Sequence, residues 1–176
     1  WMDVLAENPN VLKPSLNNSG PFRWYLYDMM RDNVAIDRWV TGLLRMEGSM
    51  LSGGPAGFGM ATQNDVPMAA KAHIVASAFL GANMKCARCH DAPYHDWTQK
   101  QLFSLAAMLG RQPIKIPATS SVPNEFFAGE SEDESLITVS LSPGEEVASA
   151  WSLASYTTSE PIDQLQFVRQ DDSREE

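Results

Sequence analysis

The feature that most constrains this 176-residue chain is a pair of cysteines three positions apart, with a histidine directly after the second. The run is Cys86-Ala87-Arg88-Cys89-His90, and the chain contains no other cysteine. Two thiols about one helical turn apart can add to the two vinyl groups of one haem, while the adjacent imidazole reaches the iron. The motif therefore predicts one covalently attached haem c, bound by Cys86 and Cys89, with His90 as proximal iron ligand.

Other chemistries use the same residue types and remain open. A structural zinc module would take its ligands from Cys86, Cys89, His90 and His95, although ligand pairs are usually separated by about a dozen residues or more. A thioredoxin-like dithiol needs a strand before the first cysteine, whereas a helix is predicted there. A plain disulfide between Cys86 and Cys89 is the simplest alternative.

The distal iron ligand is a separate question, for which the candidates are His73 and the methionines Met60, Met68, Met84 and Met108. His73 lies on the predicted helix before the motif, but a surface histidine among Ala and Lys is the simpler interpretation. Met60 follows a glycine-rich stretch that could bring its thioether to iron, but ordinary apolar contact is commoner for a methionine. His95 is expected at the surface or near a haem propionate. An open sixth position also fits the sequence.

Hydrophobic periodicity and helix-end signals predict a mainly α fold with a small β-containing C-terminal segment. The predicted helices span residues 21 to 32, 36 to 45, 67 to 80 and 98 to 109, with Thr98 as an N-cap, Gly81 and Gly110 as stops, and a loop over 48 to 59. Further on, a strand is predicted over 136 to 141, a turn at Pro143-Gly144, and a partner strand over 147 to 151.

Charge divides the chain at the same place as this change of pattern. Residues 1 to 115 carry 11 Lys and Arg against 9 Asp and Glu, and residues 116 to 176 carry 2 against 13. We therefore expect a helical haem-binding domain over 1 to 115 and an acidic β-containing extension over 116 to 176 that leads to a further domain. The net charge of -9 argues against nucleic acid as a partner, because an acidic surface repels the phosphate backbone. No apolar run approaches the ~20 residues of a membrane span.

The chain also resembles a planctomycete-type cytochrome c domain family over about residues 1 to 110. The resemblance is carried by Phe79-Leu80-Gly81, the run Cys86 to Asp91, Tyr94, Trp97-Thr98-Gln99 and Phe103 to Ala107, with Trp1 to Val4 and the helices between Tyr25 and Leu44 adding to it. Family members are large exported proteins, often with another cytochrome c domain before this region and an uncharacterised domain after it. The resemblance implies haem c at Cys86, Cys89 and His90. One departure is that the family commonly has Asp-His after the haem histidine, where this chain has Asp91-Ala92.

Together these features predict a c-type cytochrome domain that transfers electrons to and from a redox partner protein or a neighbouring haem domain. One alternative is a haem enzyme with an open sixth site, acting on peroxide or a small ligand. Another is a binding or assembly module in which the haem is structural and the β-containing acidic tail makes contacts. The zinc module is the third. Because haem is joined to two thiols by machinery outside the cytoplasm, we expect a periplasmic or otherwise exported protein. The chain is expected to be part of a larger one, whose leader is elsewhere.

Overall fold

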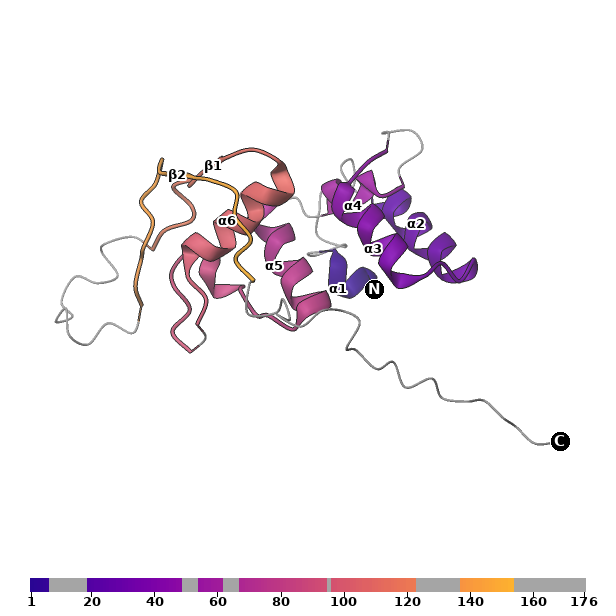
Figure 1. The fold of residues 1–176 in the computed structure, drawn as a ribbon, viewed down its shortest axis with the longest axis horizontal. Coiled ribbons are helices and arrows are strands. Elements are labelled where there is room, and N and C mark those ends of the chain that lie inside the picture. Colours follow the sequence, from indigo (N-terminus) through magenta and orange to yellow (C-terminus); the bar gives the residue numbers. More distant parts are fainter. Residues whose placement is uncertain (7–18, 49–53, 62–66, 95, 123–136, 154–176) are drawn as a thin grey trace, which may run out of the picture.

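The fold was analysed in a computed structural model that describes residues 1–6, 19–48, 54–61, 67–94, 96–122 and 137–153 (Figure 1). Its helices are α1 (Met2–Leu5), α2 (Ser19–Arg31), α3 (Ile36–Arg45), α4 (Ala56–Ala61), α5 (Pro67–Leu80), the short 3₁₀ helix η2 (Cys86–Arg88) and α6 (Gln99–Gly110). Two short strands, β1 (Ile114–Lys115) and β2 (Glu146–Val147), pair antiparallel, with Ile114 opposite Val147. The predicted mainly α fold is confirmed. No helix among the described residues is long and apolar enough to cross a membrane.

Helix α5 lies at the centre of the molecule because it is apolar on two sides (Figure 1). One side packs in what we call the first core: Ala69, Ala72, Ala76, Ala82, Met84, Ala87, Leu102, Phe103, Leu105, Ala106, Ile116, Leu141, Val147 and Leu153. The other side packs in the second core: Leu5, Ala6, Phe22, Tyr25, Leu26, Trp39, Leu43, Phe58, Ile74 and Val75. A helix buried on both sides has little room for an amphipathic pattern, which agrees with its Ala-rich sequence.

Helix ends follow the predicted signals with one shift. Gly81 takes the left-handed conformation after α5 (φ 66°). Thr98 caps α6 in a capping box, in which its hydroxyl accepts from the Gln101 N–H and its own N–H donates to the Gln101 side chain. The prediction of Gly110 as the stop is wrong by one residue, because Arg111 takes the left-handed conformation (φ 56°). The Arg111 guanidinium donates to the Arg45 carbonyl at the end of α3, which joins the two helix ends (3.2 Å).

The predicted loop over residues 48 to 59 is wrong at its C-terminal end, where α4 begins at Ala56. Gly57 in this helix allows close packing against a neighbouring helix. A β-carbon on Gly57 would lie 2.9 Å from the backbone N and Cα of Phe22, so α4 approaches α2 only because position 57 has no side chain. A glycine-rich run in the sequence therefore does not distinguish a loop from a helix that packs closely on another helix.

The predicted pairing of strands 136 to 141 and 147 to 151 is also wrong. Residue 136 lies outside the described residues. Residues 137 to 141 alternate between more and less buried but belong to no strand, and β2 pairs with β1 instead. The predicted turn is confirmed, since the Glu145 N–H donates to the Ser142 carbonyl (3.0 Å) and Gly144 has φ 85°.

The acidic extension contributes to the first core. Ile116, Leu141, Val147 and Leu153 all lie beyond residue 115, and each is at most 5% exposed. The division into domains at residue 115 stays a prediction, but the described part of the extension packs on the same apolar side chains as α5 and α6.

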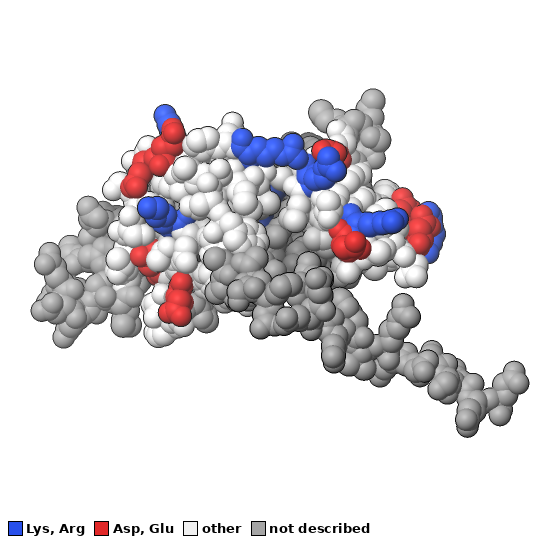
Figure 2. Space-filling model, viewed as in Figure 1, with Lys and Arg blue, Asp and Glu red and all other residues white. Residues whose placement is uncertain are grey.

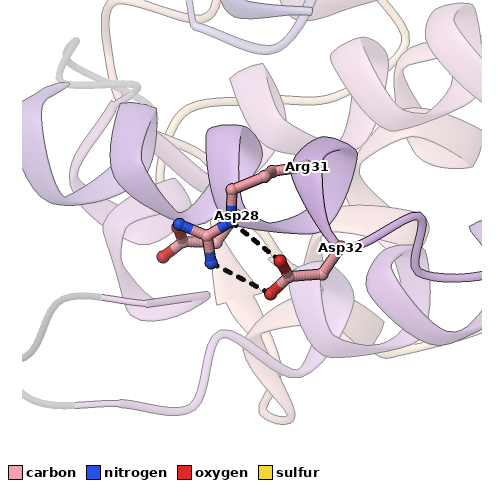
Figure 3. Close-up of polar contacts among 3 residues, drawn as sticks. All are labelled: Asp28, Arg31 and Asp32. Atoms are coloured by element: carbon pink, nitrogen blue, oxygen red, sulfur yellow. Dashed lines mark hydrogen bonds and ion pairs between the residues drawn. The ribbon is translucent and has the colours of Figure 1, made fainter.

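The surface of the described residues mixes both charges. In Figure 2, basic and acidic side chains are interspersed on the visible face. At the end of α2 the exposed Arg31 guanidinium contacts Asp28 (3.1 Å) and Asp32 (2.8 Å), as Figure 3 shows. The hydrogen bond from Arg31 holds the pKa of the Asp32 carboxyl below its usual range. These groups are solvent-exposed, so the cluster contributes little to stability.

A buried hydrogen bond joins α2 to α3. The Tyr25 hydroxyl donates to the Trp39 carbonyl (2.7 Å), and burial raises the pKa of Tyr25. We expect Tyr25→Phe to lower the free energy of unfolding by about 1 kcal/mol, the net value of one such hydrogen bond. The matched control is Tyr27→Phe on the same helix, where the ring is exposed and no loss is expected. Equal urea midpoints for the two variants would contradict this role.

Candidate functional site

The cysteine motif forms a tight turn, and buried apolar side chains in and just before the turn hold it against the first core. Its backbone bonds run from Ala87 N–H to the Met84 carbonyl (3.1 Å), from Cys89 N–H to the Cys86 carbonyl (3.2 Å) and from His90 N–H to the same Cys86 carbonyl (3.3 Å). Met84 and Ala87 are fully buried in the first core. The turn therefore faces the core with Ala87 and leaves its reactive residues toward the surface.

Both thiols of the motif are free and accessible. Cys86 is exposed and Cys89 is half-buried, with its Sγ 3.9 Å from the Thr119 carbonyl oxygen. The structure describes both thiols in their reduced form. A reduced dithiol on one turn is the form that reaction with two vinyl groups requires.

The imidazole of His90 is oriented by a backbone carbonyl. Its Nδ1 lies 2.7 Å from the Asp91 carbonyl oxygen. A carbonyl oxygen only accepts hydrogen bonds, so Nδ1 must carry the proton. In the neutral ring the lone pair is then on Nε2, which is the arrangement found in many metal-binding histidines.

Asp91 connects the motif to α6 and to residues 138–141. Its N–H donates to the Thr138 carbonyl (2.7 Å). Its carboxylate Oδ1 accepts from the Gln99 N–H (2.7 Å) and from the Ser140 hydroxyl (2.7 Å). Gln99 is the first residue of α6, so this carboxylate satisfies an N–H at the positive end of the helix.

Gln99 holds the surrounding segments together through its side chain, which is fully buried. Its Oε1 accepts from the N–H groups of Ser140 (3.0 Å) and Leu141 (3.1 Å), and its Nε2 donates to the Ser120 carbonyl (3.1 Å). Sequence reasoning missed both Asp91 and Gln99 as supporting residues. The capping box at Thr98 located the start of α6, but no local signal indicates which distant segments these two side chains bind.

The candidate distal ligands His73 and Met60 lie on α5 and α4, not on the turn that carries the motif. His73 lies on α5 and is 7% exposed, so the interpretation as a surface histidine is wrong. The neighbouring Ala and Lys residues suggested a solvent-facing position, whereas α5 is buried on two sides. Met60 lies on α4, which packs against α2 and α3, whereas η2 packs against α6. His95 lies outside the described residues. Which of these ligates iron, if any, stays a prediction.

The zinc alternative depends on a cluster of ligands. Across the described ranges, no three His, Cys, Asp or Glu side chains are grouped in a way that could hold a metal ion. The fourth ligand required by that alternative, His95, is outside those ranges. A zinc ion needs ligands that converge on one point. A covalently bound haem instead needs two thiols and one imidazole that face outward from one turn.

Apolar surface lies close to the motif in sequence. Tyr94 is 80% exposed, and the half-buried Trp97 packs against the first core. The Ala92 N–H donates to the Trp97 carbonyl (2.8 Å) and closes the loop that carries both aromatic residues. An exposed aromatic ring four positions after His90 is suited to contact with a flat apolar group.

Comparison with known proteins gives a family but no activity. The chain matches, over residues 1–113, the family model PSCyt2, described as a protein of unknown function (DUF1549). Neither a curated protein nor a solved structure matches it. The matched range includes the motif turn, Asp91 and the whole of α6. Because the match spans well over half of the chain, the chain belongs to the PSCyt2 family.

Proposed function

We propose that this chain is a c-type cytochrome domain that binds one haem covalently through Cys86 and Cys89, uses His90 as the proximal iron ligand, and transfers electrons. The observation that carries the proposal is the arrangement of the turn. Two free thiols and an imidazole with its Nε2 lone pair available lie together on one anchored turn.

Covalent attachment of the haem would consume only the two cysteine thiols and the two vinyl groups of the haem. Each S–H adds across a vinyl double bond, so that one S–C bond forms and the thiol hydrogen goes to the neighbouring carbon. This addition needs no oxidant, but it needs reduced thiols, and both cysteines are free in the structure. The two thioether bonds would then hold the group in place, and His90 would supply a nitrogen ligand to the iron. The bound haem supplies a one-electron redox centre.

The partners and the compartment follow from this chemistry. One electron enters from a donor and leaves to an acceptor, so we propose a redox partner protein or a neighbouring haem domain of a larger chain. Ligation of haem to thiols takes place outside the cytoplasm, so we propose a periplasmic or otherwise exported location.

The test is production of the full-length gene product, with and without a secretion leader and haem-maturation genes. The exported, matured protein should keep its colour after acid–acetone extraction and give the pyridine haemochrome of a haem with two thioether bonds. Colour that moves into the solvent, or holoprotein that forms equally well in the cytoplasm, would overturn the proposal.

A second measurement separates electron transfer from haem catalysis. Reversible reduction and reoxidation with no carbon monoxide binding to the reduced protein indicates a filled sixth position and supports electron transfer. Rapid carbon monoxide binding indicates an open position, and peroxide-dependent oxidation of an organic substrate would then replace electron transfer with the enzymatic alternative.

A further inference from the structure

The orientation of His90 depends on a single peptide unit, the one that joins Asp91 to Ala92. Its carbonyl oxygen accepts the His90 Nδ1–H (2.7 Å), and its N–H donates to the Trp97 carbonyl (2.8 Å). The carbonyl and the N–H of a trans peptide point in opposite directions. A bond at each end therefore fixes the direction in which the carbonyl points, and with it the plane and tautomer of the imidazole.

The peptide unit before Asp91 is fixed as well, by a segment almost fifty positions further along the chain. The Asp91 N–H donates to the Thr138 carbonyl (2.7 Å). The Asp91 carboxylate then binds the same segment a second time through the Ser140 hydroxyl, and it binds the start of α6 through the Gln99 N–H. Backbone and side chain of Asp91 are thus both bound.

The segment that binds Asp91 is itself well anchored. Gln99 accepts hydrogen bonds from the N–H groups of Ser140 and Leu141, and the Leu141 side chain is buried in the first core (4% exposed). A fully buried amide with both of its ends bonded has little freedom to move. Gln99 and the buried Leu141 side chain therefore hold residues 138–141 in place beside Asp91.

We propose that Asp91 is the positioning residue of His90, and that residues 138–141 are the support through which it acts. Asp91 keeps the proton of His90 on Nδ1 and the lone pair on Nε2. The proposal deepens the proposed function, on which it rests for the use of Nε2 as iron ligand. The tautomer itself can be measured without haem.

The first experiment uses the haem-free 176-residue chain with reduced thiols. Nitrogen-15 spectra of His90, recorded at a pH where the ring is neutral, report which nitrogen carries the proton. Wild-type protein should show a strong excess of the Nδ1–H form. In Asp91→Ala this excess should fall several-fold, because the carboxylate bonds to Gln99 and Ser140 are lost. Asp91→Asn keeps an acceptor oxygen and should restore most of the excess.

A matched control separates positioning from general loss of stability. Thr98→Ala removes the N-cap of the same helix and costs about 1 kcal/mol, but Thr98 makes no hydrogen bond to Asp91 among the described residues. The tautomer ratio in Thr98→Ala should equal that of the wild type. The assignment of Asp91 would be overturned if the excess of the His90 Nδ1–H form fell equally in Thr98→Ala and Asp91→Ala. It would also be overturned if that excess were unchanged in Asp91→Ala.

The second experiment uses the matured holoprotein. A hydrogen bond donated by the ring Nδ1–H to a carbonyl raises the basicity of the Nε2 ligand and stabilises the oxidised iron. The reduction potential of Asp91→Ala should therefore shift upward, that of Asp91→Asn should stay near wild type, and that of Thr98→Ala should not move. If Asp91→Ala has the same reduction potential as the wild type, the proposal is overturned for the haem-bound protein. A wild-type protein that never acquires haem overturns the proposed function instead, and the tautomer ratio still decides the role of Asp91.

Discussion

Replacing Cys86 and Cys89 together by alanine is expected to abolish covalent haem attachment, leaving no pigment on the exported, matured chain after acid–acetone extraction. Each thioether bond needs one thiol, and the chain has no third cysteine to take over. Single replacement of either cysteine should leave one bond. The pyridine haemochrome band of each single variant should then lie between those of haem with two thioether bonds and of free haem.

The control for the cysteine variants is Arg88→Gln, which changes the motif but keeps both thiols and the histidine. It should mature with the same amount of bound pigment as the wild type. His90→Ala should behave differently from both, because its thiols remain but its proximal nitrogen is gone, so that any attached pigment loses its low-spin spectrum. Pigment that resists extraction in the double cysteine variant would show that the bond is made elsewhere.

Local signals in the sequence predicted most of the helical part of the fold. The apolar spacing in α2 and α3, the Ala-rich run of α5 and the cap at Thr98 each depend on neighbours within a few positions. The motif was equally visible, because attachment of one haem by two thiols requires a fixed short spacing. These features can be predicted from a single chain since the physics that produces them is local.

The larger errors concern contacts between residues that are far apart in sequence. Residues 137 to 141 alternate in burial as a strand does, but their hydrogen-bond partners are Asp91 and Gln99, more than forty positions earlier. A period of two indicates an extended, half-buried segment and does not identify its partner. The same reason explains why Gln99 was not recognised, since a glutamine at the start of a helix is ordinarily solvent-exposed.

Gln99 is a fully buried polar residue whose substitution should lower the free energy of unfolding strongly. In Gln99→Leu the two N–H groups of Ser140 and Leu141 and the carbonyl of Ser120 lose their partner, while leucine nearly preserves the volume. Leaving buried polar groups unsatisfied costs about 1–3 kcal/mol for each group, partly relieved by water at the half-exposed ones. We expect a loss of about 3–4 kcal/mol in the free energy of unfolding, measured by urea denaturation with far-UV circular dichroism.

The same substitution at Gln112 is the matched control for Gln99→Leu, because Gln112 lies just past the other end of α6 and is exposed. The free energy of unfolding of Gln112→Leu should stay within about 0.5 kcal/mol of the wild-type value. The two variants also separate stability from site geometry. Loss of the amide releases residues 140 and 141, so Ser140 should leave the Asp91 carboxylate and the His90 tautomer ratio should fall in Gln99→Leu alone. Equal urea midpoints for Gln99→Leu and Gln112→Leu would mean that this amide does not hold the segments around the motif.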